Sequence, residues 1–319
     1  MEIFISVVVF LIGIGVLVKS ADLFTGAAEK LGKALGAPPF IIGVTIVALG
    51  TSLPELASSI IAVIQGSSEI VVGNVIGSNV ANIFLVLGIV AIVAKKIKID
   101  FDIIRVDLPF LLGSALLFTV AIWDGEFTWK EGILFLIGIV IYLIYTVHVE
   151  KKPKDTEIEE AIKSELPKER KLRPKTIVIL VLSGIGIYIG AKFTVDSVID
   201  IAGMLKIGTE IIATTAVALG TSLPELFVSV SAALKGKSGL AAGNILGSSI
   251  FNIFAIMGIP ALFGVLVIPA SVLVFSLPMM LIATFLFVFI TQDREITKWE
   301  GWLLILFYIF FIGKIVGIL

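Results

Sequence analysis

The sequence contains no cysteine and only one histidine, His148. Without cysteine the chain cannot form a disulfide or carry out thiol redox chemistry. Metal sites built from sulfur or from several imidazoles, which soft transition metals prefer, are excluded as well. Charged side chains are also scarce: Asp, Glu, Lys and Arg make up 15% of the chain, whereas about a quarter is usual in soluble domains.

Hydrophobic residues fill the chain instead. They account for 58% of its 319 residues, and the mean hydropathy is +1.13. Apolar runs of about 20 residues, the length at which a helix crosses a bilayer, recur from end to end. The strands of a membrane barrel would alternate polar and apolar residues instead. We therefore predict an all-α polytopic membrane protein, whose first helix is retained rather than cleaved as a signal peptide.

Ten apolar segments are predicted as transmembrane helices. The first five cover 3–25, 38–64, 69–94, 103–123 and 129–149, and the second five cover 175–199, 207–234, 238–263, 268–290 and 298–317. The segment between the two sets is the one long polar stretch. We expect residues 1–150 to form one five-helix repeat, residues 151–174 a linker, and residues 175–319 a second five-helix repeat.

The two halves of the sequence resemble each other. The letters VALGTSLPEL occur at 47–56 and again at 217–226, so Glu55 and Glu225 are 170 positions apart. At the same offset GNVIGSNVANIF at 73–84 aligns with GNILGSSIFNIF at 243–254. DGEFTWKEG from position 124 resembles DREITKWEG from position 293, at an offset shorter by one. The duplication therefore covers nearly the whole chain.

The distribution of basic residues predicts that the second repeat is inverted. Because each repeat has an odd number of spans, the second copy enters the membrane upside down, and Lys and Arg should gather in alternate, cytoplasmic loops. The loops predicted to be external contain only Lys130 and Lys206, whereas residues 151–175 contain nine Lys or Arg. We expect both termini outside the cell and the linker in the cytoplasm. The other loops predicted to be cytoplasmic contain Lys30, Lys33, Lys95, Lys96, Lys98, Lys235, Lys237, Arg294 and Lys298.

Each copy of GTSLPE places a carboxylate near the middle of a predicted span. A charge at this depth costs at least about 2.5 kcal/mol, and two converging carboxylates would also repel each other. A divalent cation bound between Glu55 and Glu225 would remove both costs. Pro54 and Pro224 lack an amide hydrogen for the carbonyl four residues earlier, which favours an interruption of the helix at each site.

Neutral oxygen ligands lie at the same depth. Inverted repeats whose interrupted helices meet at the bilayer midplane are a recurrent plan for secondary transporters, and we expect helices 2, 3, 7 and 8 to be interrupted and to form such a site. Oxygen ligands without sulfur or imidazole suit hard cations such as Ca2+ and Na+. The neutral candidate ligands are Thr51, Ser52, Ser78 and Asn82 in the first half, and Thr221, Ser222, Ser248 and Asn252 in the second.

Structural interpretations of these polar residues stand beside the functional one. Pro and Gly in membrane helices commonly produce kinks, and Ser, Thr and small residues commonly serve helix packing. Other polar residues have structural explanations: Lys19, Asp22, Lys192 and Asp196 lie toward span ends, where they can snorkel or pair with loops. Arg105 and Asp107 flank the start of the fourth span as an interfacial pair, and His148 is a surface histidine.

With GTSLPE followed by GNxxGSxxxN in both halves, the chain closely resembles the cation/calcium antiporter superfamily, and within it the prokaryotic sodium/calcium exchangers. The resemblance covers the full chain, and residues 41–84 and 211–254 are similar to the family's alpha repeats. It implies coupled, opposite movement of Na+ and Ca2+ through one site by alternating access. It also implies that Glu55 and Glu225 are the central Ca2+ ligands and serve Na+ as well.

The same resemblance implies roles for the neutral ligands. Thr51 and Thr221 would contribute carbonyl and hydroxyl oxygens, and Asn82 and Asn252 would complete the middle of the cluster. Flanking Na+ positions would be lined by Ser52, Ser78, Ser222 and Ser248 and by the carbonyls of Ala48 and Ala218.

Asn252 departs from the pattern of some archaeal members and of K+-dependent exchangers, which have Asp at this position. Two carboxylates balance one Ca2+, so we expect K+-independent, electrogenic exchange by a monomer in the lipid bilayer of the cell membrane. The alternatives are a K+-dependent exchanger, a Ca2+/H+ exchanger and, more remotely, a cation channel. An enzyme is disfavoured because no nucleophile or water-activating metal ligands accompany the carboxylates, and no cofactor or nucleic-acid partner is expected.

Overall fold

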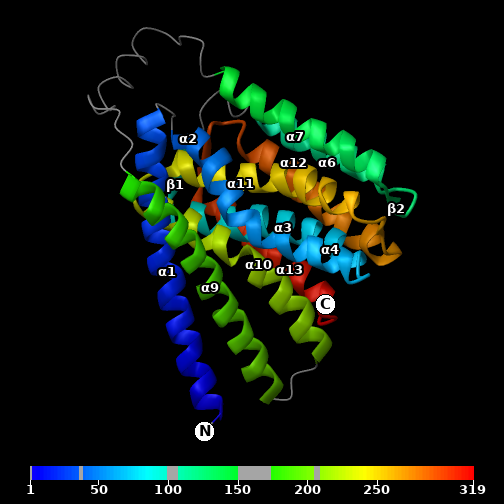
Figure 1. Cartoon of the computed structure of the whole chain (residues 1–319), viewed down its shortest axis with the longest axis horizontal. Helices are drawn as coiled ribbons and strands as arrows, with labels where there is room; N and C mark the ends of the chain where they lie inside the picture. The colour runs from blue at the N-terminus through cyan, green and yellow to red at the C-terminus, as the bar shows by residue number, and fades with distance from the viewer. Residues whose placement is uncertain (1, 36–38, 99–106, 150–173, 205–208) are drawn as a thin grey trace.

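A computed structural model describes the chain at residues 2–35, 39–98, 107–149, 174–204 and 209–319. Side chains in these ranges are described except at 2, 33, 35, 39–40, 98, 147–149, 195, 198–199, 202 and 209–221. The described backbone is mostly helical (Figure 1). Long apolar runs give helices because a helix satisfies its backbone hydrogen bonds within one segment, which hydrocarbon requires.

The first half of the chain contains two π-helical segments, η1 and η2, each continuous with α-helix on both sides. Its elements in order are α1 (Glu2–Leu35), α2 (Pro39–Ile42), η1 (Gly43–Val47), α3 (Ala48–Ile64), α4 (Glu69–Val80), η2 (Ala81–Leu87), α5 (Gly88–Ala94), β1 (Lys96–Lys98), α6 (Leu108–Ala121), β2 (Glu126–Phe127) and α7 (Trp129–Val149).

The second half contains the π-helical segments η4 and η6 and a short 3-10 helix, η5. Its elements in order are α9 (Pro174–Met204), α10 (Thr209–Leu234), α11 (Ser238–Phe251), η4 (Asn252–Ile256), η5 (Pro260–Leu262), β3 (Leu266–Val267), η6 (Val272–Ser276), α12 (Leu277–Ile290), β4 (Glu295–Thr297) and α13 (Lys298–Ile315).

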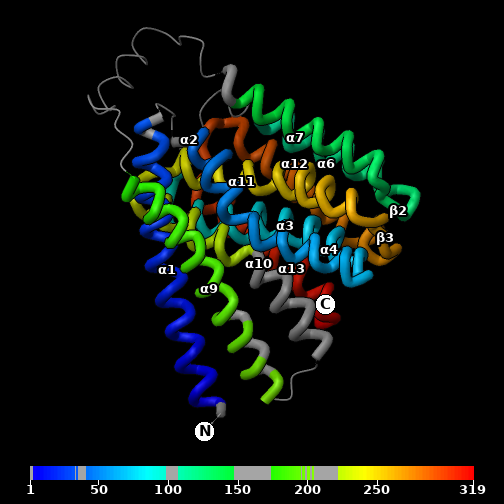
Figure 2. The backbone as a smooth tube through the Cα atoms, viewed as in Figure 1, coloured from blue at the N-terminus to red at the C-terminus, as the bar shows by residue number. Residues whose placement is uncertain are grey.

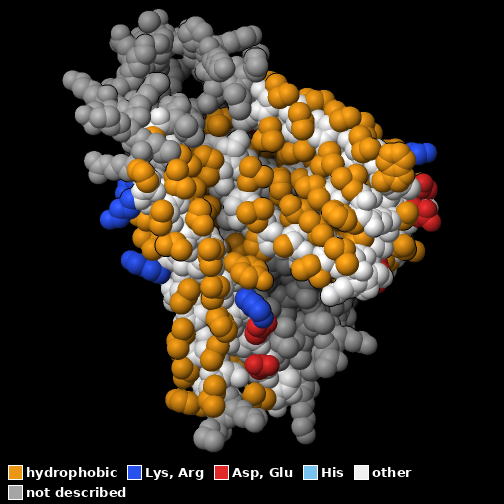
Figure 3. Space-filling model, in the orientation of Figure 1, with side chains coloured by type: hydrophobic (Ala, Val, Ile, Leu, Met, Phe, Trp, Pro, Cys, Tyr) orange, Lys and Arg blue, Asp and Glu red, His pale blue; other side chains and the backbone are white. Residues whose placement is uncertain are grey.

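Seven helical segments of the described chain are long and apolar enough to cross a membrane. Seven of the ten predicted spans overlap these segments, with bounds that differ at some ends. Two further predicted spans fall on shorter apolar stretches, Leu108–Ala121 and Ser222–Leu234. The last falls on α13, whose 18 residues include Lys298, Glu300 and Lys314. In Figure 3 apolar side chains cover most of the described part of the visible face, and charged side chains are sparse, with groups at its left and right margins and one below its centre.

Two stretches form the centre of the molecule. Within 18-residue apolar windows of these segments, 78% of the window in Glu69–Ala94 and 89% of the window in Ser238–Leu262 are buried, against 17–39% in the other five. The segment η1 packs closely on α11, where a β-carbon added at Gly247 would lie 2.5 Å from the carbonyl oxygen of Val44. The absence of a side chain at Gly247 therefore permits this backbone approach.

The long helices α1 and α9 run side by side along one side of the molecule (Figures 1 and 2). Their backbones approach closely at Gly190 of α9, where an added β-carbon would lie 2.7 Å from the amide nitrogen of Leu17. Each of the two helices also contacts α10. The pair thus joins the first helix of each half and packs on the second helix of the second half.

Two short antiparallel ladders connect the halves. Strand β1 pairs with β4, with Ile97 opposite Ile296, and β2 pairs with β3, with Phe127 opposite Leu266. The helices after β2 and β4 begin alike: Glu131 Oε2 accepts from the Thr128 amide at 2.6 Å, and Glu300 Oε2 from the Thr297 amide at 2.5 Å. Figures 1 and 2 place β1 and the β2–β3 ladder at opposite ends of the molecule.

Candidate cation site

The two GTSLPE segments meet at the centre of the molecule. Glu55 lies in α3 and Glu225 in α10. The Ser52 hydroxyl of α3 donates to Glu225 Oε1 of α10 at 3.0 Å. The two carboxyl groups are close enough to interact electrostatically. One carboxylate from each half of the chain is therefore brought to the same place.

Helices α4 and α11 contribute neutral groups around this pair. Thr51 Oγ1 lies 3.3 Å from Asn244 Oδ1 and 3.5 Å from Ser248 Oγ, both on α11. It also lies 3.3 Å from the Ala48 carbonyl oxygen in its own helix. On α4, Ser78 Oγ donates to Asn74 Oδ1 at 3.4 Å. Hydroxyl, amide and carbonyl oxygens thus gather on α3, α4 and α11, and Thr51 among them is next along the chain to Ser52, which contacts Glu225.

The cluster is sealed from solvent. Glu55 and Glu225 are each 1% exposed. Burial of an unpaired charge is costly, so such groups need a partner of opposite charge or a metal ion. The other predicted ligands with described side chains are at most 2% exposed; they are Thr51, Ser52, Ser78, Asn82, Ser222, Ser248 and Asn252.

Buried polar atoms without a hydrogen-bond partner concentrate at this place. Of the ten such side-chain atoms in the described part of the chain, eight belong to predicted ligands. Leaving a buried polar group unsatisfied costs about 1–3 kcal/mol, and more when it is charged. A bound cation would give the oxygens among them a partner. The eight are both carboxylate oxygens of Glu55, Oε2 of Glu225, the Ser222 hydroxyl, and the side-chain oxygen and nitrogen of Asn82 and of Asn252.

Irregular helix geometry occurs at two of the predicted ligands. Asn252 begins the π-helical segment η4, and Asn82 is the second residue of η2. Widened helical turns of this kind occur frequently at functional sites. The second predicted span is interrupted by η1, just before Ala48. Helices 2, 3 and 8 thus each contain a π-helical segment, although η1 comes before Pro54, where the interruption of helix 2 was expected.

The expected interruption of helix 7 was wrong. Helix α10 continues from Thr209 to Leu234 with Pro224 inside it. Likewise α3 continues through Pro54. Each proline removes one backbone hydrogen bond, but the surrounding packing keeps the remaining turns helical.

The carboxylate count distinguishes this site from an acidic metal centre. Across the described residues, no group of three or more His, Cys, Asp or Glu could hold a metal ion. The cluster thus combines two carboxylates with neutral oxygens. This composition suits hard cations such as Ca2+ and Na+, which take oxygen ligands.

Two asparagines of the cluster were not among the predicted ligands. Asn74 and Asn244 lie in the GNxxGS segments, four residues before Ser78 and Ser248, and share a helix face with them. Asn244 is fully buried and contacts Thr51. The spacing of four was the sequence signal that could have identified both.

Some predicted residues lie outside what the structure describes. The side chains of Ala218, Thr221 and His148 are among them, as are Arg105 and the linker at 151–173. Asp107, expected near the membrane surface beside Arg105, is 6% exposed and accepts a hydrogen bond from the Tyr142 hydroxyl at 3.0 Å. Lys192 pairs with Asp196 at 2.6 Å within α9, as expected for charges near a span end.

Fold and site together define a multi-pass helical membrane protein that buries an all-oxygen cluster between its two halves. The family model described as "Sodium/calcium exchanger protein" matches residues 5–149 and 175–316. The chain belongs to this family. The family is that of proteins that exchange Na+ and Ca2+.

Individual relatives agree with the family assignment. The sodium/calcium exchanger MaX1 of Methanosarcina acetivorans is 38% identical, over 97% of both chains. The putative antiporter CaxA of Alkalimonas amylolytica is 35% identical, over 96% of this chain and 97% of its own length. A structure of the sodium-calcium exchanger NCX_Mj superposes with a TM-score of 0.81 and 32% identity, covering 97% of this chain and 98% of the other.

Proposed function

We propose that this chain is a Na+/Ca2+ antiporter whose transported ions share the cluster around Glu55 and Glu225. The observation that carries the proposal is the set of eight unpartnered buried atoms in that cluster. Two carboxylates neutralise one Ca2+, and the neutral oxygens complete the high coordination number that Ca2+ takes. Na+ is also a hard cation and would use the same oxygens in part.

Within this proposal Glu55 and Glu225 are the central ligands. The neutral ligands are divided between a middle position, completed by the two asparagines, and flanking Na+ positions. Thr51 and Thr221 are proposed to contribute carbonyl and hydroxyl oxygens, and Asn82 and Asn252 to complete the middle position. The flanking Na+ positions are proposed to be lined by Ser52, Ser78, Ser222, Ser248 and the carbonyls of Ala48 and Ala218.

We further propose ten transmembrane helices arranged as two inverted repeats, 1–150 and 175–319, joined by a linker at 151–174. The positions of the strands support this arrangement. Strands β1 and β3 begin 170 positions apart, at Lys96 and Leu266, yet β1 pairs with β4 and β3 with β2. The two ladders lie at opposite ends of the molecule (Figures 1 and 2), as corresponding segments of inverted repeats should.

Inverted repeats around one buried site suit alternating access, in which one part of the protein rocks against another. The proposed membrane orientation has both termini outside the cell and the linker in the cytoplasm. The neutral Asn252 supports K+-independent exchange, because Ca2+ already balances both carboxylates. Electrogenic exchange by a monomer completes the proposal.

Ion uptake into proteoliposomes tests this function. Vesicles loaded with Na+ should accumulate radiolabelled Ca2+ when diluted into Na+-free buffer, and Glu55→Gln or Glu225→Gln should abolish the uptake by removing a ligand charge. Glu126→Gln, which neutralises an exposed acid on β2, should leave uptake unchanged. Uptake that follows an imposed pH gradient and ignores Na+ would establish proton coupling instead. Full uptake by either site variant would contradict the proposed ligands.

A further inference from the structure

Asn74 and Asn244 make the same hydrogen bond in the two halves of the chain. Asn74 Nδ2 donates to Ser59 Oγ at 3.3 Å, and Asn244 Nδ2 donates to Ser229 Oγ at 2.9 Å. Each pair spans 15 positions, and the two pairs correspond at the 170-residue offset. In each contact the amide nitrogen donates and the serine hydroxyl accepts, so the amide oxygen faces away from the serine.

With the nitrogen held in this way, the amide oxygen faces a proposed cation ligand. Thr51 Oγ1 donates to Asn244 Oδ1 at 3.3 Å, and Ser78 Oγ donates to Asn74 Oδ1 at 3.4 Å. A hydroxyl has one hydrogen and two acceptor lone pairs. When its hydrogen points to the asparagine, the lone pairs remain for a cation. A hydrogen turned toward the cation would repel it.

Asn244 also affects the Ala48 carbonyl. The Thr51 hydroxyl has a second acceptor within reach, the Ala48 carbonyl oxygen at 3.3 Å. A hydrogen bond to that oxygen would occupy a group proposed as a Na+ ligand. Asn244 on α11 offers this hydrogen another acceptor at the same distance. When the hydrogen points to Asn244, the Thr51 hydroxyl and the Ala48 carbonyl oxygen both remain available to a cation.

We infer that Asn74 and Asn244 are positioning residues, which orient the Ser78 and Thr51 hydroxyls so that oxygen rather than hydrogen faces the transported cation. This inference rests on the proposed function. It assigns these residues an effect on the affinity for cations and none on the movement between access states. Their substitution should therefore change KM for Ca2+ more than the maximal rate.

Substitution of Asn244 in proteoliposomes tests the inference. Asn244→Leu removes the acceptor while keeping the side-chain size, and should raise KM for Ca2+ about tenfold with little change in maximal rate, as expected for one lost hydrogen bond. Asn79→Leu is the matched control, because Asn79 is equally buried on α4 but donates to Met280 Sδ at 3.8 Å. In a Thr51→Val background, Asn244→Leu should have a much smaller effect.

An unchanged KM in Asn244→Leu, or the same effect in the presence and absence of the Thr51 hydroxyl, would overturn the inference. If Asn244→Leu does not fold, Ser229→Ala removes only the partner of the amide nitrogen and should raise KM about threefold; an unchanged KM there would also overturn it. Failure of the proposed function is distinguishable, because the unsubstituted protein would then show no Na+-driven Ca2+ uptake.

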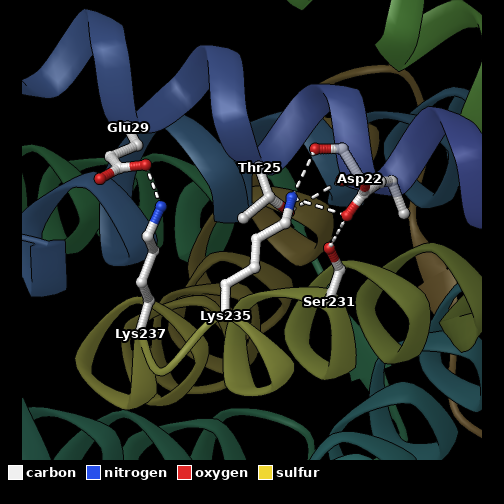
Figure 4. Close-up of polar contacts among 7 residues, drawn as sticks. Asp22, Thr25, Glu29, Ser231, Lys235 and Lys237 are labelled. Carbon is white, nitrogen blue, oxygen red and sulfur yellow. Dashed lines mark hydrogen bonds and ion pairs between the residues drawn. The ribbon is translucent and has the colours of Figure 1, made fainter.

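A separate observation concerns ion pairs between α1 and the end of α10 (Figure 4). Lys235 Nζ lies 2.6 Å from Asp22 Oδ1 and donates to the Asp22 carbonyl oxygen at 2.8 Å. Ser231 Oγ donates to Asp22 Oδ1 at 3.1 Å. Lys237 pairs with Glu29, which lies about two helical turns after Asp22 on α1. These contacts tie α1, and with it α9, to the connection between α10 and α11.

The corresponding contact in the other half is not possible. At the 170-residue offset, Gln65 and Ser67 stand where the second half has Lys235 and Lys237. These neutral side chains cannot form ion pairs. Lys192, which corresponds to Asp22, pairs with Asp196 in its own helix. The ion pairs therefore belong to only one end of the molecule.

We propose that the Asp22–Lys235 and Glu29–Lys237 pairs form a latch that stabilises one access state over the other. This follows from the proposed inverted repeats, since two identical halves would make the two states equivalent. The four side chains are between 19% and 49% exposed, so solvent weakens the pairs. Their loss should change the ratio of the states by about fivefold.

Spin-label distances on the cysteine-free chain test the latch. Labels at Val18→Cys of α1 and Trp299→Cys of α13, both exposed, report the position of α1 relative to the rest. Lys235→Gln with Lys237→Ser, which copies the first half, should increase a second distance population about fivefold. Lys192→Gln should not. Exchanging the charges of the Asp22–Lys235 pair, by Asp22→Lys with Lys235→Asp, should preserve the original distance distribution.

A distance distribution unchanged by the double substitution would overturn the latch. So would an equal change in Lys192→Gln, or a charge exchange that behaves like the loss of the pair. Because the measurement needs no ion flux, its result is independent of which cations the protein transports.

Discussion

At the scale of single residues, Glu55 and Glu225 occupy corresponding positions but differ in their hydrogen bonds. Glu225 accepts from Ser52, whereas neither carboxylate oxygen of Glu55 has a partner. The hydroxyl of Ser222, which corresponds to Ser52, is unpartnered as well. Glu55 therefore has two unpartnered oxygens available to a cation. We expect bound Ca2+ to stabilise the buried carboxylate of Glu55 more than that of Glu225.

The neutral Asn252 leads to a prediction about coupling. Asn252→Asp would add a third carboxylate to a buried site, so bound Ca2+ would leave one negative charge without a partner. We expect Ca2+ uptake by this variant to be raised by K+ or by acidification, either of which supplies the missing positive charge. Uptake by Asn252→Ala, which adds no charge, should not respond to K+. If Ca2+ uptake by Asn252→Asp responds neither to K+ nor to acidification, the proposed balance of charges is wrong.

The two glutamates were the clearest sequence signal, because an ionisable residue inside a span is a functional candidate by default, whereas Ser and Asn there also serve helix packing. The roles of Asn74 and Asn244 were not, because they depend on contacts with other helices. Asn244 is 193 positions from Thr51, and spacing along one helix gives no information about such a distant partner. Asp107 likewise needed the fold, since its partner Tyr142 lies on another helix.

At the scale of helices, apolar run length predicted where the helices lie, and the T-x-x-E pattern matches the starts of α7 and α13. The sequence did not predict that π-helical segments would occur in these helices. They arise where packing between helices outweighs regular hydrogen bonding, and no residue at 81–87 or 252–256 breaks a helix by itself. Proline misled the prediction for helix 7, because its local effect did not end the helix in packed surroundings.

Close packing of η1 on α11 gives a prediction with an internal control. In Gly247→Ala the new methyl group would meet the Val44 backbone, whereas at Gly77, the corresponding position in the first half, a β-carbon meets nothing within 4 Å. We expect Gly247→Ala to destabilise the protein by about 1–3 kcal/mol through overpacking. Gly77→Ala should be neutral or stabilising, because Ala favours helix.

Thermal unfolding of the purified protein in detergent measures both effects. The Tm of Gly247→Ala should fall by several degrees, and that of Gly77→Ala should be unchanged or higher. Equal effects of the two substitutions would show that the approach of η1 to α11 is not tight.

At the scale of the whole molecule, the duplicated sequence predicted two related halves, and the alternation of basic loops predicted their inversion. Which helices contact one another was beyond the sequence. The pairing of α1 with α9 and the exchange of strand partners between the halves depend on packing between segments far apart in the chain. The repeat offset shows which segments correspond, but it does not show which of them touch; that requires the fold.

The sidedness of corresponding positions tests the inversion. Gln65 and Lys235 are both exposed and correspond at the repeat offset. A membrane-impermeant thiol reagent added to intact cells should label Gln65→Cys and should leave Lys235→Cys unlabelled until the membrane is opened. The native chain has no cysteine to interfere. Labelling of both positions from the same side would rule out inverted repeats.

The central claim is that one carboxylate from each half binds the same cation, and equilibrium binding of Ca2+ to the purified protein tests it most directly. The account predicts a single Ca2+ that Na+ displaces and K+ does not. It predicts loss of this binding in Glu55→Gln and in Glu225→Gln, with each variant still folded by its Tm. Ca2+ binding that survives either substitution, or that Na+ fails to displace, would contradict it.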